Sequence, residues 1–213
     1  MFGLDQRALF PVLAAIAGLA LAPAAQATIA PLTVAQLTDA SDYIVRGTVG
    51  QVYVETDERG YHWTRVELEV VTVIKGDADT RALQLDVMGG FLGGDGTLSW
   101  YSPRFDSDEE VLVFAEQLES GLLVPTGLMQ GKLTVRIDPD DGREMLVRYQ
   151  PMSPEKPYDH RFIPHPALAD RIYLTDTLEQ IRQRMTDGWD GQPIQGKAPE
   201  RLLEMHPGAE VVR

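Results

Sequence analysis

The residues that could carry out catalysis do not have the spacing that a known mechanism requires. Glu109 and Glu110 are adjacent carboxylates, but neighbouring residues of a strand point to opposite faces and cannot flank one scissile bond. No serine lies in the Gly-x-Ser-x-Gly turn of the serine hydrolases. Cysteine is absent, which excludes thiol catalysis, cysteine-ligated zinc and thiol redox chemistry. We therefore predict no catalytic residue.

Two groups of potential metal ligands fit simpler roles. The aspartates of residues 138–141 supply oxygen ligands, but Gly142 comes one residue early for a calcium loop and Tyr149 stands where the bidentate glutamate belongs. His160 and His165 lie in a proline-rich stretch, which does not hold histidines in ligand geometry as a helix does. We interpret residues 138–142 as a turn, and His160 and His165 as structural or solvated side chains. We therefore predict no metal and no cofactor.

A glycine-rich segment is the most distinctive feature of the chain. Residues 89–96 read Gly-Gly-Phe-Leu-Gly-Gly-Asp-Gly, but they lack the Lys-Ser/Thr pair and the following helix of a phosphate-binding loop. We expect a flexible loop at the mouth of a barrel, a place where loops commonly contact ligands. The large apolar residues in and after this loop are Phe91, Leu92, Trp100, Tyr101 and Phe105. These side chains either form a partner-binding patch or fold back as a plug of the core.

The charge of the chain narrows the choice of partners. Lysine and arginine number 19, aspartate and glutamate number 32, and the formal net charge is -13. Such a surface repels phosphate backbones, so we expect no nucleic-acid partner. Another exported protein is the partner that we expect.

The N-terminal segment has the pattern of a cleavable signal peptide. Arg7 supplies a positive charge, residues 8–22 are apolar, and residues 25–27 form the small-x-small pattern that signal peptidase accepts. We predict cleavage between Ala27 and Thr28 and export to the periplasm or the medium. No later apolar run approaches the length of a membrane span, so we expect no span after cleavage.

The remaining chain has the alternation of a β protein. Residues 63–74 form the clearest strand, with Val66, Leu68, Val70 and Ile74 expected on one face and charged residues on the other. This pattern predicts a long strand that is buried on one side.

Other strands are shorter. Residues 43–49 are rich in β-branched side chains, and Gly47 indicates a bulge or a tight bend. Residues 83–87 alternate, and residues 111–114 form the apolar run of a central strand. Residues 133–149 predict a hairpin around an Asp-Pro-Asp-Asp-Gly turn.

Two helices are expected outside the strands. One covers residues 33–41 and is capped by Thr33, and the other covers residues 175–185 and is capped by Thr175 or Asp176. The apolar face of the second helix consists of Leu178, Ile181 and Met185.

These elements predict a mainly β fold: a small antiparallel barrel with a short N-terminal helix and a C-terminal amphipathic helix. The expected divisions are a signal peptide (1–27), a β-barrel domain (28–150), a proline-rich arm with a helix (151–187) and a mobile tail (188–213).

Between residues 32 and 137 the chain resembles a family of exported bacterial proteins without an established activity. The matching pieces are residues 42–49, Thr64, residues 73–76, Gly89-Gly90, residues 103–105, residues 110–114 and residues 127–132. That family is distantly similar to the netrin-like barrels of tissue inhibitors of metalloproteinases, so the resemblance implies an OB-type barrel with a helix beside it. Those inhibitors use disulfides and an N-terminal cysteine that reaches a protease zinc. This chain has no cysteine, so the resemblance carries over a fold and no catalytic residue.

Three functions remain open at this point. The first is a non-enzymatic interaction or accessory protein that binds its partner through the loops of residues 89–105. The second is a peptidase-inhibitor-like protein, in which the free amine of Thr28 and the residues after it enter a protease cleft. The third is a hydrolase of an unrecognised kind.

Overall fold

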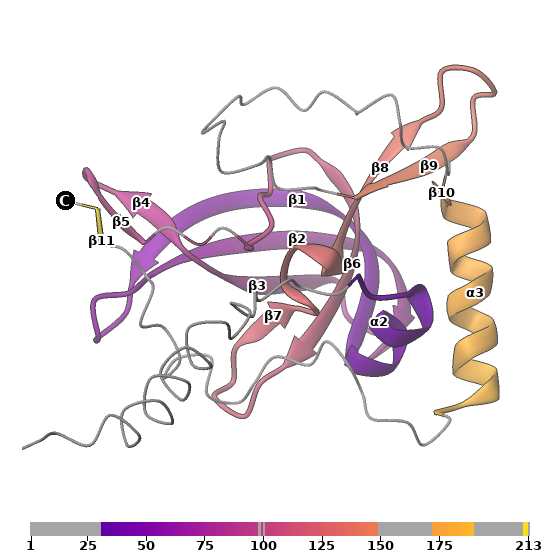
Figure 1. Ribbon diagram of the computed structural model, residues 1–213, viewed down its shortest axis with the longest axis horizontal. Coiled ribbons are helices and arrows are strands. Elements are labelled where there is room, and N and C mark those ends of the chain that lie inside the picture. The colour runs from indigo at the N-terminus through magenta and orange to yellow at the C-terminus, as the bar shows by residue number, and fades with distance from the viewer. Residues whose placement is uncertain (1–30, 98, 100, 149–171, 190–210, 213) are drawn as a thin grey trace, which may run out of the picture. The chain divides into compact units, whose positions relative to one another are not determined.

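The computed structural model describes residues 31–97, 99, 101–148, 172–189 and 211–212 (Figure 1). Residues 1–30, which include the predicted signal peptide, most of the predicted proline-rich arm and residues 190–210 lie outside this part of the chain. The described residues form a curled antiparallel sheet, a smaller sheet and two α-helices. The predicted mainly β, barrel-like fold with a short N-terminal helix and a C-terminal helix is thereby confirmed.

The strands of the large sheet are β1 (Tyr43–Thr56), β2 (His62–Lys75), β3 (Ala82–Met88), β6 (Glu110–Gln117), β7 (Leu123–Pro125), β8 (Lys132–Ile137), β9 (Glu144–Arg148) and β10 (Ile172–Tyr173). The small sheet contains β4 (Gly90–Leu92), β5 (Asp95–Thr97) and β11 (Val211–Val212). The helices are α2 (Val34–Ala40), α3 (Leu174–Asp187) and the short 3-10 helix η2 (Leu128–Gly131).

The large sheet has the order β10-β9-β8-β6-β1-β2-β3, and β7 pairs with the far end of β6. Its curl brings β3 close to β7, and a side chain joins the two strands: Asp86 Oδ2 on β3 accepts a hydrogen bond from the Leu123 N–H on β7 at 2.8 Å. Asp86 also pairs with Arg65 on β2. The partly closed barrel is therefore joined at this place by a buried carboxylate.

The pairing of the long strand β1 is irregular where the strand carries Gly47. The pairing of β1 with β2 shifts register between Arg46 and Gly47, and a Cβ atom at Gly47 would lie only 2.6 Å from the carbonyl oxygen of Glu69. The glycine is needed because the neighbouring backbone approaches so closely. The irregularity predicted at Gly47 is present as this register shift, and its extra residue lies on β2.

The alternation predicted for β2 is confirmed in its first half. Val66 and Leu68 are buried against the interior of the curled sheet, and Val70 packs beside them. For Ile74 the prediction is wrong. Val71 is an extra residue in the ladder with β1 and is 65 % exposed, and a bulge of this kind reverses which residues face inward. Ile74 consequently packs on the opposite side of the sheet.

Two apolar clusters lie on the two sides of the sheet. The inner core, inside the curl, consists of Val45, Val49, Val66, Leu68, Leu85, Val87, Phe105, Val111, Val113, Ala115 and Leu123. The outer core, beneath the helices, consists of Leu32, Leu37, Ile44, Leu112, Phe114, Leu133, Val135, Leu146, Leu174 and Ile181. Residues of β6 alternate between the two, which confirms it as a central strand and explains its continuous apolar sequence.

The two helices cover the outer core. In α2 the predicted cap is confirmed, because Thr33 Oγ1 accepts a hydrogen bond from the Gln36 N–H and Gln36 Oε1 accepts one from the Thr33 N–H. In α3 the predicted cap is wrong: the N-cap is Tyr173, which makes no side-chain cap bond. Arg184 of α3 donates to both carboxylate oxygens of Asp39 in α2, at 2.6 and 2.8 Å, and holds the helices together.

The apolar face of α3 lies further toward its N-terminus than predicted. Leu174 and Ile181 are buried in the outer core, and Leu178 packs against them. Met185 is 44 % exposed, so its place on the buried face was predicted wrongly. The last turn of the helix extends past the outer core, and the ion pair of Arg184 takes the place of apolar contact there.

Candidate functional site

The glycine-rich segment forms a hairpin where we expected a loop. Strands β4 and β5 pair with Leu92 opposite Asp95, which leaves a two-residue turn of Gly93 and Gly94. Their φ angles are 62° and 99°, the sign required at both central positions of a type I′ turn. A Cβ at either glycine would meet no atom within 4 Å, so the tip projects from the neighbouring chain (Figure 1).

The base of this hairpin is fixed to the start of β2. Gly89 N–H donates to the carbonyl of His62 at 2.9 Å, and the Thr64 hydroxyl donates to the carbonyl of Gly89 at 2.6 Å. On the other strand, Thr97 Oγ1 accepts a hydrogen bond from His62 N–H at 3.1 Å. A Cβ at Gly90 would come within 3 Å of the Val54 side chain, so the glycine permits this close packing.

Phe91 and Leu92 are the exposed apolar residues of the hairpin. They are 52 % and 50 % exposed, and as neighbours on a strand they point to opposite faces. The ring of Phe91 lies against Gly96 of the paired strand, in the space that a side chain there would need. Both faces of an anchored hairpin thus present a large apolar side chain to solvent.

The other predicted partner-binding residues are placed differently. Tyr101 is 44 % exposed, whereas Phe105 is 7 % exposed and belongs to the inner core. Phe105 therefore takes the role of core plug and does not contribute to an exposed patch. Trp100 and Thr28 lie outside the described residues.

A buried ion pair beside Phe105 was not predicted from the sequence. Lys132 Nζ and Glu109 Oε2 are 2.6 Å apart, and both side chains are under 10 % exposed. The ammonium lies 4.9 Å from the centre of the Phe105 ring and donates to the carbonyl of Arg104. Thr134 donates to the second oxygen of Glu109 at 2.6 Å. Burial lowers the pKa of Lys132, and the hydrogen bond and attraction of Glu109 oppose that shift.

This pair fixes residues 103–109 against β8 rather than forming a reactive site. Every polar atom of the pair is occupied by neighbouring protein groups, so the carboxylate and the amine are not presented to a substrate. The alternation of residues along β8 could have indicated the buried lysine. Leu133 and Val135 face the outer core, so Lys132 and Thr134 point to the opposite face of the sheet, toward the interior of the curl.

The turn of the β8–β9 hairpin uses its aspartates internally. Asp138 Oδ1 accepts the Asp140 N–H, and the Tyr173 hydroxyl donates to Asp138 and to Asp141. Asp141 also accepts two bonds from Arg143, whose guanidinium lies 3.5 Å from the centre of the Tyr173 ring. These contacts, led by the backbone N–H of Arg143, lower the pKa of Asp141 to about 2. The predicted hairpin is confirmed.

Reactive groupings are sparse in the part of the chain that the structure describes. No cluster of three or more histidine or acidic residues there is arranged to hold a metal ion. His62 Nδ1 lies 3.3 Å from Thr97 Oγ1 and serves to anchor β5. None of the described helices is long and apolar enough to cross a membrane. His160 and His165 fall outside the described residues.

Comparison with known proteins adds no relative: no protein-family model matches the chain, and no curated protein matches it. The β4–β5 hairpin presents two large apolar side chains to solvent, whereas the buried polar groups of Glu109 and Lys132 hold parts of the fold together.

Proposed function

We propose that the chain is exported and acts as a non-enzymatic interaction protein that binds a partner protein through the β4–β5 hairpin. One observation carries the proposal: Phe91 and Leu92 are about half exposed on a hairpin whose base is tied to β2. Export rests on the sequence of residues 1–27, with cleavage expected between Ala27 and Thr28.

The hairpin has the properties of a binding element. Phenylalanine is a frequent anchor of protein interfaces, since a large apolar ring gains much on leaving water and has few torsions to restrict. The two-residue turn and the bonds at Gly89 and Thr97 hold the backbone before a partner arrives. A pre-organised element loses little conformational entropy on binding.

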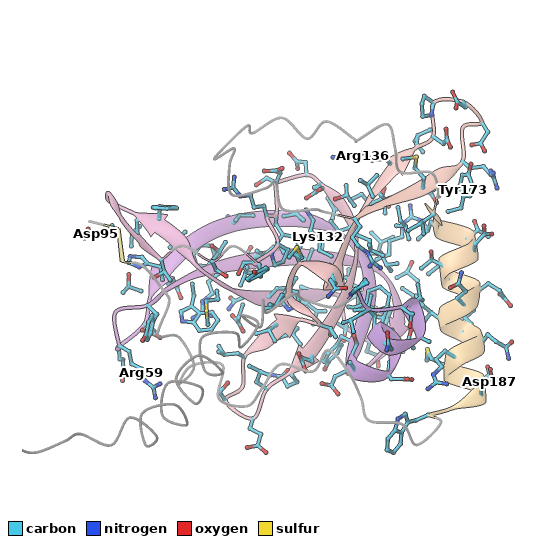
Figure 2. All side chains as sticks on the ribbon, viewed as in Figure 1. Arg59, Asp95, Lys132, Arg136, Tyr173 and Asp187 are labelled. Atoms are coloured by element: carbon cyan, nitrogen blue, oxygen red, sulfur yellow. The ribbon has the colours of Figure 1, made fainter. Side chains whose placement is uncertain are left out.

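The surroundings of the hairpin supply a polar rim. Asp95 is exposed next to the turn, and Glu58 and Arg59 are exposed in the turn that joins β1 to β2. Figure 2 places Asp95 and Arg59 at the same end of the molecule's β structure. Interfaces commonly surround an apolar centre with polar groups of this kind. With a net charge of -13, a partner with a basic surface is favoured.

We also infer that the barrel is of the OB or netrin-like type. The order of its strands supports this, because β1 pairs with both β2 and β6, β2 pairs with β3, and β6 pairs with β7. With β3 joined to β7 through Asp86, these five strands make a partly open barrel, as in OB-type folds. Loops at the ends of such barrels are common ligand sites.

Site-specific photo-crosslinking tests the binding proposal. A photoreactive amino acid replaces Leu92 in the exported protein, and a matched control carries it at Glu67, an exposed position on the outer face of β2. We expect one discrete crosslinked species from position 92 in the cells that produce the protein, and none from position 67. Absence of a species specific to position 92 would overturn the proposal.

A further inference from the structure

The hairpin has one main-chain edge that is already paired with another part of the chain. In the small sheet the order is β11-β5-β4, so β5 lies between β4 and the C-terminal strand β11. Val211 pairs with Thr97 and Val212 with Gly96, in antiparallel register. The end of the chain thus occupies the β5 edge of the hairpin (Figure 1).

This pairing shows what the β5 edge accepts. An edge strand carries main-chain donors and acceptors that need partners, and an extended peptide can supply them by adding a strand. Gly96 has no side chain to hinder the approach of another backbone, and Thr97 directs its hydroxyl to His62. The added segment here is a Val-Val pair, and valine is favoured in strands.

The pairing is also short enough to be exchanged. β11 contains only two residues, and the net gain from each hydrogen bond is close in size to the entropy lost when one residue is ordered. A longer or better-matched segment can therefore replace the chain's own C-terminal end.

We propose that the outer edge of β5 is a strand-acceptor site for an extended segment of the partner protein, and that Val211–Val212 occupies this site as an internal competitor. The inference rests on the proposed function and names the form in which the partner binds. The segment contains two adjacent β-branched aliphatic residues. In the partner segment, the residue after the one that pairs with Gly96 would lie opposite Asp95, which is exposed. A lysine or arginine is favoured at that position, because it would pair with the aspartate across the strands.

A peptide with the chain's own C-terminal sequence serves as the probe. A fluorescent peptide of residues 204–213 is titrated against the full-length wild type and against a full-length Val211→Pro, Val212→Pro variant. Proline has no N–H for a ladder, so the variant leaves the edge open. Because a tethered competitor acts at high effective concentration, we expect the variant to bind the peptide at least about tenfold more tightly than the wild type.

Two controls identify the mode of binding. A Val211→Thr, Val212→Thr variant keeps β-branched residues and should bind the peptide as weakly as the wild type. A peptide methylated on the nitrogens of both valines keeps their side chains but cannot pair as a strand, and it should not bind the proline variant.

Equal affinity of the wild type and the proline variant, or binding of the methylated peptide, would overturn the proposal. A wild type that sediments as a dimer and a proline variant that sediments as a monomer would overturn it too, since the occupant would then be a second copy of the chain. Crosslinking from position 92 is independent of residues 211 and 212, so failure here is distinguishable from failure of the proposed function.

Discussion

At the scale of single residues, two phenylalanines in one stretch of sequence have different roles. Phe91 is 52 % exposed on the hairpin, and Phe105 is 7 % exposed beside the Glu109–Lys132 pair. The sequence offered both roles for both residues, because an aromatic side chain near glycines can pack inward or project outward. The difference depends on the hairpin pairing and on the buried lysine, which are contacts between distant parts of the chain.

The two phenylalanines should respond differently to truncation. Phe105→Ala removes a ring from the inner core and should lower the free energy of unfolding by about 3–5 kcal/mol. Phe91→Ala removes a ring that is already half in water, so the loss should stay under about 1 kcal/mol. Denaturant titration of both variants measures this. Equal losses would place Phe91 in the core and remove it from the binding surface.

The carboxylate of Asp141 should titrate well below the usual range. Its pKa falls from 3.8 to about 2 because the backbone and side chain of Arg143 and the Tyr173 hydroxyl bond to the charged form. A depressed pKa means that the associated stabilisation is present above pH 3.8 and is lost as the pH falls toward 2. Arg143→Gln removes the guanidinium but keeps the backbone N–H bond to Asp141. The midpoint of the Asp141 titration should therefore rise, but it should stay below 3.8. Carbon-detected NMR titration follows the carboxyl directly, and an unchanged midpoint would contradict these contacts.

At the scale of elements, the local pattern predicted β2 and α2 well and failed where neighbouring strands intervene. The alternation of Val66, Leu68 and Val70 is a local signal, and so is the capping pair of Thr33 and Gln36. The extra residue Val71 arises from the register with β1, which no pattern within β2 records. The cap of α3 at Tyr173 likewise depends on β10 pairing with β9.

The register shift of β1 gives a matched test with two glycines of the same strand. A Cβ at Gly47 would lie 2.6 Å from the Glu69 carbonyl oxygen, whereas one at Gly50 would meet its nearest atom at an ordinary 3.5 Å. Gly47→Ala should therefore destabilise by about 1–3 kcal/mol, as overpacking does. Gly50→Ala should change stability by under about 0.5 kcal/mol. Thermal and urea unfolding of the pair decide the point, and equal effects would contradict the close approach at the bulge.

The sequence identified the β4–β5 segment by its glycines and its two apolar residues. It did not show that the segment forms a paired hairpin rather than a loop. Two glycines at a tip permit a disordered loop and a tight turn equally, and only the pairing of Leu92 with Asp95 separates them. The pairing of β11 with β5 joins the C-terminal end to the middle of the chain. Such a contact leaves no local pattern in either segment.

At the scale of the whole molecule, the chain has an expected export signal in residues 1–27, no cysteine and a net charge of -13. The described fold is held by two apolar cores and by ion pairs such as Arg184–Asp39, which joins the two helices. A chain stabilised in this way does not depend on disulfides for its fold, which suits an exported protein without cysteine.

Cleavage of the predicted signal peptide is directly measurable. The Ala-Gln-Ala sequence of residues 25–27 should be cleaved after Ala27, so the protein recovered from the envelope or the medium should begin at Thr28. Intact-mass spectrometry with N-terminal sequencing determines this. Replacing Ala27 with a bulky residue should block cleavage at that bond. An exported form that retains Met1 would contradict the prediction.

The central claim is that the β4–β5 hairpin holds the partner, and the affinity of the partner captured at position 92 tests it most directly. Its Kd is measured for the wild type, for Phe91→Ala with Leu92→Ala, and for Glu67→Ala as the exposed control. Loss of anchors at an interface costs 2 kcal/mol or more, which corresponds to at least about 30-fold in Kd. We expect that loss for the hairpin variant and an unchanged Kd for Glu67→Ala. A hairpin variant that folds as the wild type and binds with the same Kd would contradict the account.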